Sequence, residues 1–214
     1  MDMKQRIEQA ALAVHKAFEA KGNRVISLDD VKEIAYALKY RLESNLQIHG
    51  QWFTEHWRNG NLLAFDDQGS NIFTTEGMNF ILDEVFNAGG ACTGDLYCNI
   101  YKANVTPAAG DTAATKLGAA GTYEECQATT HIDEATRQAF TVAAASSANV
   151  TNTANKATFT IADTLTVYGG FVVTDSATTS TAGTLINAKK FATARDVEDG
   201  DALNVLISLT LTSS

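Results

Sequence analysis

Cysteine is scarce in this sequence, and its number and spacing exclude two classes of small protein. The chain of 214 residues holds three cysteines, Cys92, Cys98 and Cys126. So small and odd a number does not build the disulfide framework of a secreted domain, and the Cys92–Cys98 spacing does not match a zinc knuckle. We therefore expect three reduced, partly buried thiols that pack as small hydrophobic side chains.

Basic charge is also in short supply. The chain has 16 Lys and Arg against 25 Asp and Glu, so its formal net charge is −9. Such a chain lacks the basic patch that binds nucleic acid, and an anionic membrane surface repels it. No stretch approaches the roughly 18 apolar residues of a membrane span, and no apolar stretch follows Met1–Arg6 as in a signal peptide. We expect neither a nucleic-acid nor a membrane partner, and assembly in a reducing cytoplasm.

Motifs that carry catalysis or bind cofactors are missing. The chain contains no H-E-x-x-H zinc motif, no G-x-S-x-G nucleophile elbow, no P-loop and no G-x-G-x-x-G motif. Its four histidines show no metal-binding spacing: His15, His49, His56 and His131. We therefore expect a protein that is not an enzyme, with no catalytic residue, no cofactor and no metal-ligating residue.

One acidic run leaves a question about calcium. Asp196, Glu198, Asp199 and Asp201 lie in the sequence D-V-E-D-G-D. Calcium loops place carboxylates at alternate positions around a sharp turn, and this run follows only part of that pattern. The sequence does not decide whether the loop near Asp199 binds calcium.

The first part of the chain has apolar residues at helical spacing. One stripe covers residues 7–18, a second covers residues 31–46, and the aromatic segment 51–58 (QWFTEHWR) favours a further short helix. A third helix is expected to begin at Thr74 or Thr75. Its predicted apolar face consists of Met78, Ile81, Leu82, Val85 and Phe86. We predict a helical arm or subdomain over residues 1–70.

The second part has the alternation and threonine content of β-strands. The predicted strands cover 95–102, 122–128, 137–143, 156–162, 164–174, 183–191 and 202–212. Gly169–Gly170 interrupts one of them, as a bulge or a bend does. Residues 106–121 and 143–155 are rich in Ala, Thr, Ser and Gly and are predicted to be long loops. The fold class is therefore α+β: N-terminal amphipathic helices, then a domain over residues 71–214 with one helix and an antiparallel β-sandwich, jelly-roll or Ig-like.

The aromatic residues Trp52, Phe53 and Trp57 have two interpretations. Aromatic clusters of this kind belong more often to a core than to a binding platform. If the cluster is exposed, it marks a surface for a partner.

Several segments together resemble small structural proteins of tailed bacteriophages. In that family a "T-x-E-G-x-N-x-L-L" helix precedes a strand that ends in an aromatic residue, as in IFTTEGMNFILDEVFNAGG (72–90) and DLYCNIY (95–101) here. NVTPAAGDTAAT (104–115) is similar to the family's "N-Y-T-P" loop, with Val105 where an aromatic residue is usual. The runs 158–174 and 183–212 are similar to its last two strand pairs, including the pattern F-x-x-x-R-x-V-x-x-G-D-x-L-x-V. The resemblance covers about residues 70–214.

The resemblance implies a virion structural protein, most specifically a capsid decoration or cement protein on the capsid surface. Its implied partners are the major capsid protein and further copies of itself, as a homotrimer or another homo-oligomer. Residues 1–60 would then be an arm that holds the oligomer together or clamps the capsid. The alternative is a tail, fibre or head–tail junction protein with a host-receptor or glycan-binding role. An enzyme such as a sugar hydrolase would need two paired carboxylates, and no pair in the sequence stands out.

Overall fold

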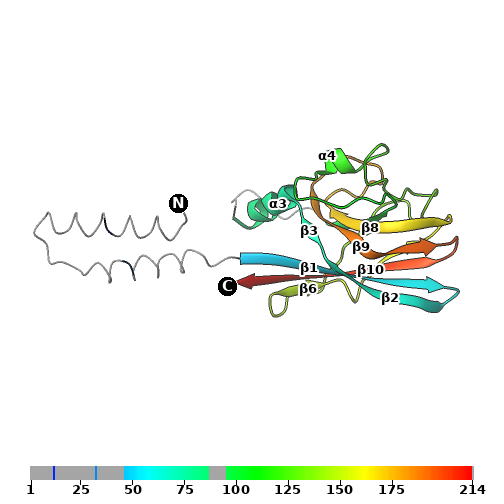
Figure 1. The fold of residues 1–214 in the computed structure, drawn as a ribbon, viewed down its shortest axis with the longest axis horizontal. Helices are drawn as coiled ribbons and strands as arrows, with labels where there is room; N and C mark the ends of the chain where they lie inside the picture. The colour runs from blue at the N-terminus through cyan, green and yellow to red at the C-terminus, as the bar shows by residue number, and fades with distance from the viewer. Residues whose placement is uncertain (1–11, 13–31, 33–45, 87–94, 214) are drawn as a thin grey trace, which may run out of the picture. The chain divides into compact units, whose positions relative to one another are not determined.

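The structure is a computed structural model that describes residues 12, 32, 46–86 and 95–213. The chain divides into two compact units, one of Met1–Gln47 with Thr212–Ser214 and one of Ile48–Leu211. The predicted stripe over 7–18, nearly all of the stripe over 31–46, and Cys92 lie outside the described residues. The second unit is made of two antiparallel sheets, with a helix beside them (Figure 1).

Each sheet has five strands. Sheet A has the order β2-β1-β10-β6, with β7 also paired to β10, and sheet B has the order β3-β9-β8-β4-β5. The strands of sheet A are β1 (Leu46–Arg58), β2 (Asn61–Ser70), β6 (Asn149–Thr151), β7 (Ala157–Thr160) and β10 (Ala202–Ser213). Those of sheet B are β3 (Ile72–Phe73), β4 (Tyr97–Tyr101), β5 (Gln138–Ala139), β8 (Leu165–Val173) and β9 (Leu185–Val197). The helices of this unit are α3 (Thr75–Phe86) and α4 (Ala113–Lys116).

The main core consists of apolar side chains that alternate along the strands. In β10, Leu203, Val205 and Ile207 are fully buried, and they pack with Trp52 of β1 and Ile100 of β4. A period of two places such residues on one face of a strand, which explains why β10 is the clearest strand in the sequence. The antiparallel β-sandwich predicted from the alternation is therefore supported at the level of two antiparallel sheets around one core.

A second core cluster covers part of sheet B. Tyr101, Tyr123 and Phe171 pack with Leu117, which follows α4. The rings of Tyr101 and Tyr123 are stacked with centroids 4.8 Å apart. Gly169 is needed here, because a Cβ at this position would overlap the Tyr101 ring. The pairing of β8 with β9 shifts register between Val167 and Gly169, so the strand is irregular where the sequence predicts a bulge or a bend.

One open edge of the sandwich is closed by side chains. The amide of Gln68 in β2 accepts a hydrogen bond from the backbone N–H of Thr193 in β9 (3.1 Å) and donates to its carbonyl oxygen (3.4 Å). Asp66 and Arg195 form an ion pair between the same two strands. A side-chain amide thus takes the place of a neighbouring peptide and protects an edge that would otherwise pair with other chains.

The segment 51–58 is the main correction to the sequence prediction. It is not a helix but the second half of β1, paired with β2. Trp52 is in the core, whereas Phe53 and Trp57 are only half-buried, so the aromatic cluster is divided between core and surface. The sandwich unit therefore includes residues 48–70, which the sequence prediction assigned to the helical part.

The remaining strand predictions differ mainly at their ends. β9 continues to Val197, beyond the predicted end at 191, and β5 covers only two residues of the predicted 137–143. The predicted strand 122–128 is reduced to two isolated bridges, Tyr101 with Glu125 and Ala128 with Ile132. The two predicted loops contain short elements, α4 in one and β6 in the other. In the part of the chain that the structure describes, no helix is long and apolar enough to cross a membrane.

Candidate functional site

Helix α3 is fixed to β9 by the residues at its start. The Thr74 hydroxyl accepts a hydrogen bond from the backbone N–H of Gly77 (2.9 Å), which is an N-cap interaction, and donates to the Leu185 carbonyl oxygen. The Glu76 carboxylate accepts from the backbone N–H groups of Leu185 (2.9 Å) and Ala113 (3.0 Å). Gly77 lies so close to β9 that a Cβ there would overlap its backbone. The T-x-E-G segment thus holds the helix at a defined place on sheet B.

Most of the predicted apolar face of α3 points to solvent. Met78, Leu82 and Val85 are spaced like one helical stripe, and their exposed fractions are 41%, 54% and 65%. The sequence predicts this apolar face but not what covers it, and these three residues are exposed in the structure. The helix contacts the sandwich through Gly77, which lies against β9, and through Phe80, which packs on the main core. Because the side with Gly77 and Phe80 packs on the sandwich, the stripe of Met78, Leu82 and Val85 stays exposed.

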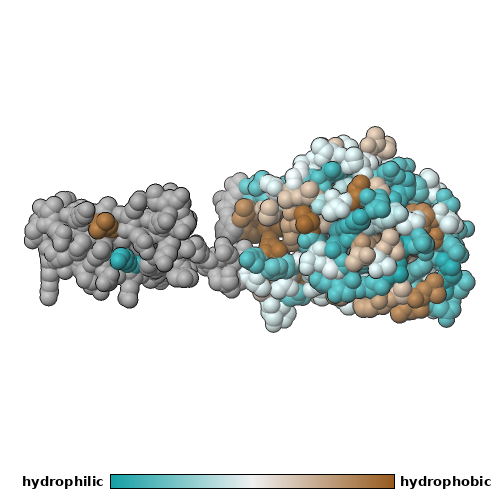
Figure 2. Space-filling model, in the orientation of Figure 1, coloured by the Kyte–Doolittle hydropathy of each residue, from teal (hydrophilic) through white to brown (hydrophobic). Residues whose placement is uncertain are grey.

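An apolar groove lies next to this helix. It has a volume of about 280 Å³ and an almost entirely apolar wall. Phe73, Phe80 and Ile81 line it from the side of sheet B and α3, and Ile48 and Leu209 line it from sheet A. Figure 2 shows hydrophobic residues gathered around α3 and the neighbouring end of the sandwich. We call the exposed stripe and this groove together the α3 surface.

The charges beside the α3 surface are acidic. Asp83 and Glu84 lie near the C-terminal end of α3, and the last turn contains no basic residue. The C-terminal end of a helix carries partial negative charge, so acids there are unfavourable. One carboxylate oxygen of Glu84 is buried without a hydrogen-bond partner in the described part of the chain. An apolar partner that also carries Lys or Arg would complement this surface.

The acidic run at 196–201 is engaged by the protein's own residues. The Asp201 carboxylate is buried and accepts hydrogen bonds from Arg58 Nε (2.7 Å), His56 Nε2 (2.7 Å) and the backbone N–H of Glu198 (2.8 Å). The hydrogen bond from Arg58 is the largest influence that holds the pKa of Asp201 well below its ordinary value. The Thr166 hydroxyl donates to Asp196. These bonds give the run a structural role at the β9–β10 turn.

Metal ligation has no candidate in residues 46–86 and 95–213. No group of three or more His, Cys, Asp and Glu side chains is arranged there to hold a metal ion. His56, which the sequence left without a role, is the histidine that contacts Asp201. His49 lies near the start of β1, where it is exposed, and His15 lies outside the described residues.

The sequence did not reveal a buried ion pair. Arg137 and Glu125 have fully buried side chains and form two hydrogen bonds, from Nε to Oε1 (2.7 Å) and from Nη2 to Oε2 (2.9 Å). Asn99 also donates to Glu125 (2.7 Å), and Arg137 donates to the carbonyl oxygens of Asp175 and Ser180 (both 2.9 Å). The pair joins the segment before β5 to the loop after β8. Both residues come from irregular segments, so no periodic pattern indicates it.

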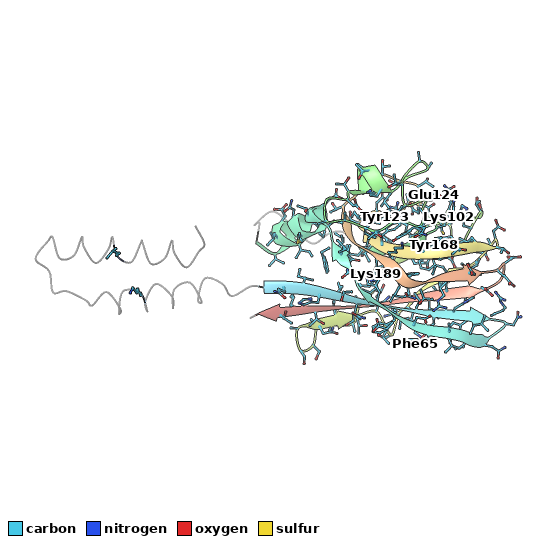
Figure 3. All side chains as sticks on the ribbon, viewed as in Figure 1. Phe65, Lys102, Tyr123, Glu124, Tyr168 and Lys189 are labelled. Atoms are coloured by element: carbon cyan, nitrogen blue, oxygen red, sulfur yellow. The ribbon has the colours of Figure 1, made fainter. Side chains whose placement is uncertain are left out.

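A depression of about 430 Å³ with both polar and apolar walls is lined by Lys102 and Glu124, which are labelled in Figure 3. Lys102 Nζ donates to Glu124 (2.7 Å), and the ring nitrogen Nδ1 of His131 accepts from the backbone N–H of Gln127 (3.1 Å). Burial, followed by the nearby charge of Lys102, lowers the pKa of His131. The charged groups here are paired with each other, and no serine, threonine or cysteine is hydrogen-bonded to this imidazole among the described contacts.

The two described cysteines are inert. Cys98 and Cys126 are buried and unpaired, as expected for reduced structural thiols. Burial raises the pKa of Cys98 far above its ordinary value and that of Cys126 to about 12. Since the thiolate is the reactive form, neither side chain is a nucleophile near neutral pH.

Comparison with known proteins gives no relative. No protein-family model, no curated protein and no solved structure matches the chain. The α3 surface therefore has to be interpreted from its own chemistry.

Proposed function

We propose that this chain is a virion structural protein of a tailed bacteriophage, most specifically a decoration protein that cements the capsid. The observation that carries the proposal is the α3 surface. A helix fixed rigidly to the sandwich presents Met78, Leu82 and Val85 to solvent, beside an apolar groove. Exposed apolar surface of this kind marks a site for a protein partner. The motif resemblance at residues 72–90 and 183–212 supplies the identity of the partner, the major capsid protein.

The charged residues support a structural role over a catalytic one. Asp201 is occupied by Arg58 and His56, and Glu125 by Arg137, each within the folded unit. Catalysis needs an acid, base or nucleophile that is free to reach a substrate. We therefore propose a protein that is not an enzyme and uses its charges to fix turns and loops.

A single α3 surface is small, so we propose that several copies of the protein bind the capsid together. Stable protein interfaces bury about 800 Å² on each partner. Several copies placed around a symmetry axis of the capsid add their weak contacts, which raises the overall affinity without larger individual surfaces. A homotrimer on the outer capsid surface, assembled in the host cytoplasm, fits this requirement.

The proposal is tested by mixing the purified full-length chain with capsids assembled without it, then sedimenting the particles. We expect saturation at a fixed ratio to the major capsid protein and a higher melting temperature of the particle. Val85→Asp should abolish binding, whereas Leu63→Asp, which places the same charge at another exposed apolar position, should not. If the chain fails to bind heads but binds tails or host cells, the capsid role is wrong.

A tail, fibre or junction protein that recognises a receptor or glycan remains the second candidate. The observation that favours it is a depression on the outer face of sheet A that contains an exposed aromatic residue.

A further inference from the structure

The outer face of sheet A carries a concave site that is separate from the α3 surface. Its volume is about 440 Å³. Phe53 and Phe65 form one side of it, Thr151 and Ser208 lie toward β6, and Glu55 and Lys156 also line it. Successive side chains of a strand point to opposite faces of the sheet. Trp52 of β1 points into the core, so Phe53 and Glu55 point to the outer face. We call these six residues the aromatic shelf.

The aromatic part of the shelf is rigid and accessible. The rings of Phe53 and Phe65 are nearly parallel, with an interplanar angle of 12° and centroids 6.0 Å apart. Phe65 nevertheless leaves 57% of its surface exposed, and Figure 3 shows it at the β2 side of the molecule. A large exposed aromatic ring in a strand is unfavourable in water unless something packs on it. The apolar C–H face of a pyranose ring has the size and chemistry to do so.

The polar residues of the shelf have no net charge. Glu55 accepts hydrogen bonds from Lys156 Nζ (2.7 Å), Asn204 Nδ2 (2.9 Å) and Trp57 Nε1 (3.0 Å). Burial raises the pKa of Glu55, but these hydrogen bonds outweigh it and the net pKa is lowered, so the carboxylate is charged at neutral pH. The single ammonium group of the shelf is therefore balanced by a single carboxylate, and no arginine lines the site. This arrangement disfavours a phosphate or a sugar acid, which an arginine fork would bind.

The shelf still offers hydrogen-bonding groups to a ligand. An ammonium group has three donors, and Lys156 uses one of them on Glu55. The Ser208 hydroxyl accepts from Asn149 (2.7 Å), which leaves its own proton to donate. The Thr151 and Thr153 hydroxyls are 2.7 Å apart, and the pair retains one donor. These groups lie in the same depression as the aromatic rings.

We propose that the aromatic shelf binds a neutral saccharide, with one sugar ring packed on Phe65 and its hydroxyls bonded by Lys156, Ser208 and Thr151. The site does not depend on the capsid role, because it uses a different face of the sandwich. In a particle, it would give a weak contact with a glycan that repetition of the subunit strengthens.

The test uses the full-length chain on an array of neutral and acidic glycans, followed by calorimetric titration with the strongest neutral glycan. We expect binding to neutral glycans in preference to acidic ones. Phe65→Ala should weaken the affinity about tenfold or more, the scale expected for loss of an aromatic contact, and Leu63→Ala should leave it unchanged. Both side chains are exposed, so the unfolding midpoints of the two variants should match the parent and exclude misfolding.

Three results would overturn the proposal: no neutral glycan binding at millimolar concentration, preference for acidic glycans, or equal affinities of Phe65→Ala and Leu63→Ala. Capsid binding of Phe65→Ala should be normal. Loss of glycan binding and loss of capsid binding are therefore separate observations, and either function can fail without the other.

Discussion

Replacing Arg137 by methionine should be among the most destabilising single changes in the sandwich. The variant removes a fully buried guanidinium. Within the described residues, the Glu125 carboxylate, also fully buried, then keeps hydrogen bonds only from Asn99 and the backbone N–H of Thr179. Breaking a buried ion pair by removing one partner costs about 3–5 kcal/mol, because a charge stays buried without compensation. That is a large part of the roughly 5–15 kcal/mol that stabilises an ordinary domain.

The assay is urea unfolding monitored by tryptophan fluorescence. Trp52 and Trp57 are the only tryptophans of the chain, and both lie in β1 of the sandwich. The matched control is Lys102→Met, which breaks the partly exposed pair with Glu124. Pairs of that kind contribute about 0–1 kcal/mol.

A double variant separates the pair from the rest of its network. Glu125→Gln combined with Arg137→Met removes both charges, so its loss of stability should be smaller than the sum of the two single losses. If Arg137→Met costs no more than Lys102→Met, the argument that this buried pair organises the two loops is refuted.

Three further outcomes follow from individual contacts. Gly77→Ala should lower the unfolding midpoint by displacing α3 from β9, whereas Gly110→Ala, which has open space around its Cβ, should be nearly neutral in the same thermal melt. The hydrogen bond from Arg58 holds the folded pKa of Asp201 below its ordinary value of roughly 4. This contact therefore stabilises the fold above about pH 4, and the stabilisation is lost as the pH falls further. Asp201→Asn should remove this loss of stability from a curve of unfolding free energy against pH. Cys98 should stay unlabelled by maleimide in native protein and react after urea unfolding, as mass spectrometry of the peptide can show.

The sequence predicts those strands in which apolar residues recur at a regular spacing. β10 has apolar residues at every second position with polar residues between them, and these pack in the core as expected. β1 was missed because its inward face carries Thr54 and His56, both buried and polar, so no clean alternation appears. The sequence predicts the apolar stripe of α3 but not what the stripe contacts, because only the structure shows that Gly77 turns toward β9.

The candidate sites depend on residues that are distant in the sequence. In the sequence Asp201 belongs to an acidic run with part of a calcium-loop pattern, whereas in the structure its partners are Arg58 and His56, more than 140 positions earlier. The aromatic shelf likewise joins Phe53 and Phe65 of one hairpin to Lys156 from another part of the chain. Local patterns describe elements, whereas these contacts arise only when the two sheets have assembled.

The most direct test of the central claim is a thiol-labelling measurement on the α3 surface. In a Cys92→Ser background, Leu82→Cys and Leu63→Cys each place one thiol at an exposed apolar position, while the buried Cys98 stays unreactive. Labelling rates are measured for the free protein and for the protein bound to capsids. We predict that the thiol at position 82 becomes protected on capsids and the thiol at position 63 does not. Equal labelling at position 82 with and without capsids would contradict the proposal that the α3 surface is the binding site.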